Sequence, residues 1–192
     1  MSLEFDIRRT IILSEYMKNW GMPEFRRIMS KDNESVELYE FPCAGSDIYR
    51  FATVGLSSFN FSDSKTCNVE LVLVVSNSIA LKQNQDLYNY LFDVMAYILA
   101  EMGGYAKPED LIPESALAPD GWPKALLFDE PRGEPESLGC FHVGSQHVDL
   151  LWLIPIFGSE YDLIKEEGIR RFDAAIEDMK LELVDVNRQS CG

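Results

Sequence analysis

The residues best suited to chemistry lie close together near position 145. The chain has two histidines, His142 and His147, with Cys140 and Asp149 beside them. Residues two apart in a strand point to the same face, so each histidine shares a face with its cysteine or aspartate neighbour. Such a set suits a transition-metal site or a Cys–His nucleophilic pair. The spacing is not diagnostic, and adjacent strand positions provide no oxyanion hole and no third orienting group. We therefore interpret both histidines as residues of a hairpin, and predict no catalytic residue, no metal and no cofactor.

The sequence motifs of common enzyme classes are missing elsewhere in the chain. It has no Gly-x-Gly-x-x-Gly, no Walker loop and no Gly-x-Ser-x-Gly. Two adjacent acid pairs, Asp129-Glu130 and Glu166-Glu167, are typical of solvated surfaces rather than of general acid–base catalysis. We expect a protein that is not an enzyme.

The segments that position these residues alternate between helix and strand patterns. Residues 5–20 have the apolar spacing of an amphipathic helix, and Pro23 can open a helical turn through Ile28. Residues 35–41, 48–56 and 68–76 predict a three-strand meander, and the nearly continuous apolar run of the last favours a central strand buried on both faces. Residues 84–102 predict a long, mostly buried helix.

The second half repeats this alternation after a proline-rich loop at 105–124. Strands are predicted at 125–128, 140–143 and 148–156, and a short strand at 183–186. Residues 159–179 are predicted to be helical, either as one helix or as two helices that abut at Gly168. This order predicts an α+β fold with a mixed, mostly antiparallel sheet packed by helices. We predict an N-terminal helical segment, residues 1–34, and a main domain, residues 35–192, within one globular unit.

Charge limits the partners that this chain can bind. Its 192 residues hold 17 Lys and Arg against 32 Asp and Glu, a formal net charge of −15, while residues 1–33 alone are net +1. This acidity argues against nucleic acid and anionic membranes and favours a basic protein partner. The sequence has no apolar run long enough to span a membrane, no secretion signal and no close cysteine pair. We expect a cytoplasmic protein.

Aromatic side chains gather around the second strand of the meander. Tyr49, Phe51, Phe59 and Phe61 lie there, and the last two alternate with polar residues. Exposed aromatics beside an acidic rim suit a protein-binding patch, and burial in the core is the alternative interpretation.

Several segments together resemble the suppressor of fused domain, over roughly residues 35–187. They are Phe51-Ala-Thr-Val-Gly-Leu-Ser57, Val69-Glu-Leu-Val-Leu73, Leu126-Leu-Phe-Asp-Glu-Pro131, Val148-Asp-Leu-Leu-Trp-Leu-Ile-Pro-Ile156, Ser159-Glu-Tyr-Asp and Lys165-Glu-Glu-Gly168. The resemblance implies a mixed α/β fold without established catalytic residues. Animal members bind a zinc-finger transcription factor, and bacterial members resemble immunity proteins of polymorphic toxin systems. The short chain resembles the bacterial kind.

The resemblance also implies a binding region. Animal members clamp a peptide against a sheet edge after the strand that here ends in Gly55, Leu56 and Ser57, and Asp63 is the one acidic residue of the loop that follows. The partner-binding residues predicted from the resemblance and from the aromatic patch are Tyr49, Gly55, Leu56, Ser57, Phe59, Phe61 and Asp63. An immunity protein for a basic toxin is the leading hypothesis. The alternatives are a metal- or Cys/His-dependent enzyme around Cys140, His142, His147 and Asp149, and a chaperone for a secreted effector.

Overall fold

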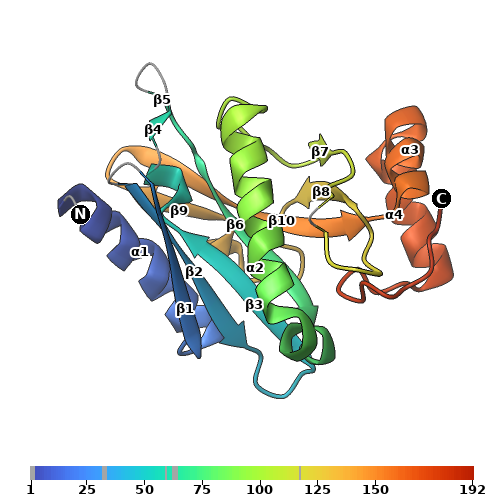
Figure 1. Ribbon diagram of the computed structural model, residues 1–192, viewed down its shortest axis with the longest axis horizontal. Coiled ribbons are helices and arrows are strands. Elements are labelled where there is room, and N and C mark those ends of the chain that lie inside the picture. The colour runs from blue at the N-terminus through green and yellow to red at the C-terminus, as the bar shows by residue number, and fades with distance from the viewer. Residues whose placement is uncertain (1–2, 32–33, 59, 62–64, 117) are drawn as a thin grey trace.

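One large sheet forms the centre of the molecule, and helices cover both of its faces (Figure 1). The computed structural model describes residues 3–31, 34–58, 60–61, 65–116 and 118–192. The helices are α1 (Leu3–Trp20), α2 (Asn77–Ala100), α3 (Gly158–Glu167) and α4 (Ile169–Met179), with single 3-10 turns at Leu56–Ser58 and Glu136–Leu138. The strands are β1 (Phe25–Lys31), β2 (Glu34–Pro42), β3 (Ile48–Val54), β4 (Asn60–Phe61), β5 (Lys65–Thr66), β6 (Val69–Ser76), β7 (Leu111–Ile112), β8 (Ala125–Asp129), β9 (Cys140–Val143) and β10 (Gln146–Ile156).

The strand order explains why distant segments of the chain meet. Within the described residues, eight strands form the large sheet in the order β1-β2-β3-β6-β10-β8-β7, with β9 paired to the first part of β10. All neighbouring pairs are antiparallel except β6 and β10, which are parallel. The predicted α+β fold with a mixed, mostly antiparallel sheet is therefore confirmed.

Strand β6 lies in the middle of this sheet, as its apolar run predicted. Its residues from Val69 to Val75 are buried. Because side chains alternate between faces, Leu71 and Leu73 belong to the core under α2, and Val72 belongs to the core on the opposite face. Glu70, the single charged residue of the strand, is also completely buried.

The helices cover the two faces unequally. α2 lies across one face (green in Figure 1), where its buried side chains complete a core with β2, β3, β6, β8 and β10. On the other face, α1 buries Ile12, Tyr16 and Trp20, while Ile164 of α3 and Phe172 of α4 join the same cluster at the far end of the sheet. None of the described helices combines the length and the hydropathy needed to cross a membrane.

Two local predictions are wrong. Residues 25–31 form β1 and pair with β2 along their whole length, from Phe25 opposite Glu40 to Lys31 opposite Glu34, instead of continuing a helical turn from Pro23. Pairing with a neighbouring strand outweighs the local preference for helix. Residues 183–186 are turns and irregular backbone rather than a strand. Of the two alternatives for residues 159–179, the structure has two helices, because Gly168 with a φ of 86° separates α3 from α4. The proposed boundary at residue 34 stays a prediction.

Candidate functional site

The segment Gly55–Ser57, predicted to contact a partner, is buried in the structure. Gly55 leaves β3 with a φ of 105°, a conformation that favours glycine. The backbone N–H groups of Gly55 and Ser57 donate to Glu70 Oε1 over 2.9 and 3.1 Å, and the Ser57 hydroxyl donates to the same oxygen over 2.6 Å. Leu56 between them is fully buried. The segment is thus fixed to the centre of the sheet, and its role in partner binding stays a prediction.

Glu70 and Arg8 form a buried polar centre that the sequence analysis missed. Thr53 donates its hydroxyl hydrogen to Glu70 Oε2 over 2.7 Å. Burial raises the pKa of the Glu70 carboxyl, against the opposing effect of its hydrogen bonds. Arg8 of α1, 3% exposed, donates to the carbonyl oxygen of Ser57 over 3.2 Å and also to the side chain of Gln146. The sequence signal that could have predicted this centre is Glu70 itself, a single charged residue within the apolar run of β6.

The predicted aromatic patch is divided between surface and core. Phe51 is completely buried and belongs to the core under α2, while Tyr49 next to it on β3 is partly exposed. Phe59 and Asp63 lie outside the described residues, and of Phe61 only the backbone, in β4, is described. Of the described residues among these, Phe51, Gly55, Leu56 and Ser57 are buried and Tyr49 is partly exposed, and their role in partner binding stays a prediction.

The cysteine and histidines, in contrast, do come together. β9 and β10 form a hairpin in which Cys140 lies opposite Asp149, and His142 opposite His147. The imidazole rings meet edge to face with centroids 4.6 Å apart, and Cys140 Sγ lies 3.8 Å from His147 Nδ1. One ligand atom from each of Cys140, His142 and His147 lies within 4.8 Å of the others.

The residue types of this hairpin are those of a transition-metal ligand set, one cysteine and two histidines. Burial and the neighbouring Asp149 carboxylate raise the pKa of the Cys140 thiol. The thiolate is the reactive form both as a nucleophile and as a metal ligand, so this shift favours neither role. Both histidines are exposed, so the cluster lies on the surface of the hairpin.

Acidic side chains concentrate in the segment 101–150, which holds ten Asp and Glu against three Lys and Arg. A cavity of about 590 Å³ opens within it, between residues 130–136 and β10. We call this cavity the acidic hollow, because its lining includes Glu130, Glu134, Glu136 and Asp149. Arg132 is the one basic residue among its described lining residues. Glu130 and Glu136 are exposed at its rim and face solvent.

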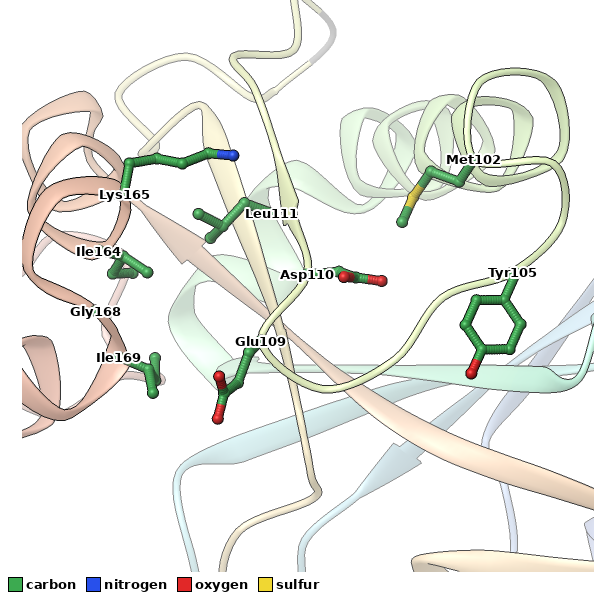
Figure 2. Close-up of a pocket in the computed structure, with 9 residues that line it drawn as sticks. All are labelled: Met102, Tyr105, Glu109, Asp110, Leu111, Ile164, Lys165, Gly168 and Ile169. Carbon is green, nitrogen blue, oxygen red and sulfur yellow. The ribbon is translucent and has the colours of Figure 1, made fainter.

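A second pocket has a volume of about 510 Å³ (Figure 2). Figure 2 shows it between the α3–α4 junction, with Lys165 and Ile169, and the segment that follows α2, with Tyr105, Glu109 and Asp110. Pro108 lines the acidic hollow and the adjacent Glu109 lines this pocket. The two cavities therefore approach each other at residues 108–109, and the second one carries the acidic Glu109 and Asp110 together with the basic Lys165.

The fold of this chain is similar to that of solved suppressor of fused structures. A SUFU homologue from Neisseria gonorrhoeae FA 1090 has a TM-score of 0.71 at 12% identity, with 96% of this chain and 97% of that chain covered. The structure of the Sufu–Fu complex has a TM-score of 0.66 at 16% identity, covering 96% of this chain and 91% of that one. Drosophila Suppressor of Fused has a TM-score of 0.66 at 17% identity, covering 94% of this chain and 49% of that one. At these identities the likeness shows the fold alone.

The family follows from the sequence itself. The family model for Suppressor of fused protein (SUFU) matches residues 15–189, so the chain belongs to the SUFU family. No curated protein matches the sequence. The resemblance seen in the sequence motifs is thereby confirmed at the level of the family, which is associated with protein binding.

Proposed function

We propose that this protein is a non-catalytic binding protein, and specifically an immunity protein that neutralises a bacterial toxin with a basic surface. The single observation that supports it most is the acidic hollow. A partner with a positively charged groove is attracted by such a surface at long range and orients on it before contact. Membership of a protein-binding family and the net charge of −15 point the same way.

The distribution of charge selects this surface over the open edge of the sheet. β1 is the outermost strand at one end of the sheet, and it carries Arg26 and Arg27. Arg26 lies 3.6 Å from the buried Glu37, and Arg27 covers the Tyr88 ring at 4.0 Å. Basic side chains on an edge strand oppose the approach of a basic partner. We therefore place the partner at the acidic hollow.

Support for a binding role also comes from the charge and openness of the acidic hollow. Its lining has four carboxylate side chains against the single basic side chain of Arg132, and it opens to solvent, as expected for a surface that attracts a basic macromolecule.

Co-expression with the product of the neighbouring gene tests the toxin hypothesis. We expect the two proteins to co-purify in a one-to-one complex that buries about 1,600 Å² in total, and expression of this protein to restore growth of cells that produce the partner. An unrelated acidic protein of similar size and charge is the control for non-specific neutralisation. A partner that is harmless but delivered out of the cell would favour the effector chaperone, and recovery of no partner would contradict the proposal.

A further inference from the structure

The β9–β10 hairpin holds three side chains in an arrangement that suits a metal ion. Cys140 and His142 lie two apart on β9, so their side chains point to the same face of the sheet. The register places His147 directly opposite His142, which brings its side chain to that face as well. We propose that Cys140, His142 and His147 bind a zinc ion at a site that adjoins the acidic hollow, because Cys140 also lines that cavity.

The distances fit a tetrahedral ion with little rearrangement. Zn–S bonds of about 2.3 Å and Zn–N bonds of about 2.05 Å at tetrahedral angles separate sulfur and nitrogen by about 3.6 Å. Cys140 Sγ and His147 Nδ1 are 3.8 Å apart. The third ligand atom lies within 4.8 Å of both, and rotation of the exposed His142 side chain can bring it closer.

The donor atoms select the kind of ion. One sulfur and two imidazole nitrogens suit zinc and other late transition metals, whereas Mg²⁺ and Ca²⁺ require oxygen ligands. Three protein ligands leave the fourth tetrahedral position to water. Asp149, opposite Cys140 on the same hairpin, adds a negative charge that attracts a cation.

The consequence of binding is a cross-link between the two strands of the hairpin. The ion would join β9 to β10 on either side of the turn at Gly144 and Ser145, next to Gln146, which accepts a hydrogen bond from the buried Arg8. The other face of the hairpin is buried through Phe141 and Val148. Zinc would therefore stabilise the hairpin and, through it, the contact between α1 and the sheet.

Titration of untagged protein with Zn²⁺ and Co²⁺ tests this site. An affinity tag with histidines must be absent, because it would compete for the metal. We expect one equivalent of metal to bind, and the Co²⁺ form to show the intense visible absorption of tetrahedral cobalt and a near-ultraviolet thiolate-to-cobalt band. The two histidines of the chain are both in the cluster, so ¹⁵N-histidine NMR should show every imidazole signal shift on addition of Zn²⁺.

Matched variants decide between this site and adventitious binding. Cys140→Ala and His142→Ala should each lower the affinity at least tenfold and remove the tetrahedral cobalt spectrum, whereas Cys43→Ala, a partly buried cysteine outside the cluster, should keep both. At a free zinc concentration about 100-fold above Kd, the melting temperature should rise by roughly 5–10 °C. Absence of stoichiometric binding, imidazole signals that do not move, or equal affinity in Cys140→Ala and Cys43→Ala would overturn the proposal. None of these results depends on whether a toxin partner exists.

Discussion

Arg188 should contribute more to the stability of this fold than any exposed charge, because it neutralises a carboxylate that has no access to water. Arg188 Nη2 lies 2.8 Å from Glu160 Oε2, and the two side chains are 2% and 0% exposed. Glu160 also accepts from the backbone N–H groups of Phe157 and Cys191, over 2.9 and 3.2 Å, so it joins the start of α3 to the C-terminal segment. Replacing Arg188 by alanine leaves this buried carboxylate without its cation.

The loss expected for Arg188→Ala is about 3–5 kcal/mol of the free energy of unfolding, the usual effect of removing one partner of a buried ion pair. For a chain of this length, that corresponds to a fall in melting temperature of roughly 6–20 °C. Urea unfolding followed by tryptophan fluorescence measures the free energy, and thermal unfolding by circular dichroism measures the temperature.

Two matched variants make the comparison specific. Arg171 and Glu167 form an ion pair at 3.5 Å with about half of each side chain exposed, so Arg171→Ala should cost less than about 0.5 kcal/mol. Replacing both members of the buried pair, as in Arg188→Met with Glu160→Leu, should recover part of the stability lost in Arg188→Ala, because no unpaired charge remains. Equal losses in Arg188→Ala and Arg171→Ala would refute the assigned role of the buried pair.

Two further predictions concern titratable groups. Hydrogen bonds from Ser46 and then from Arg50 lower the pKa of the Cys43 thiol, while burial raises that of Cys67 to about 12. Iodoacetamide should therefore modify Cys43 first in the native protein and leave Cys67 unmodified, as mass spectrometry of timed samples can check; equal rates would contradict this. Burial raises the pKa of Glu70 in the folded chain above its ordinary 4.5, so between the pKa values of the unfolded and folded chain folding takes up a proton. The free energy of unfolding therefore falls as pH rises between these two pKa values. Glu70→Gln removes this contribution. Urea unfolding at mildly acidic and neutral pH should therefore show that the free energy of unfolding of wild type, minus that of Glu70→Gln, decreases as pH rises. An increase of this difference with pH would contradict the assigned direction of the pKa shift.

Much of the fold was predictable because its strongest signals are local. The apolar run of β6 predicted a central strand, and Gly168 indicated where two helices, α3 and α4, could abut. β1 was not predictable in this way, since residues 25–31 become a strand by pairing with β2 rather than by their own pattern. Residues 183–186 are not a strand because they pair with no described strand; they form turns that lead to Arg188, whose side chain binds Pro155 and Glu160.

The candidate site was less predictable than the fold. Motif resemblance singled out Gly55 and Ser57, but the structure turns both toward the buried Glu70, a contact that only the sheet register reveals. Cys140 and His147 were recognised as possible ligands from spacing within single strands, yet their 3.8 Å approach depends on pairing across the hairpin. The acidic hollow combines residues of the 130–136 segment with β10, which no local pattern brings together.

The most direct test of the proposed binding surface is the association rate of the toxin-like partner with charge-reversed variants. Glu130→Lys with Glu136→Lys changes the rim of the acidic hollow, and Glu177→Lys with Asp178→Lys makes the same change of charge on exposed residues of α4 that line neither pocket. We expect the first pair to slow association about tenfold or more at low salt, with the difference shrinking as salt is added, and the second pair to have a much smaller effect. Equal slowing by both pairs, or unchanged association after reversal at the rim, would contradict binding through the acidic hollow.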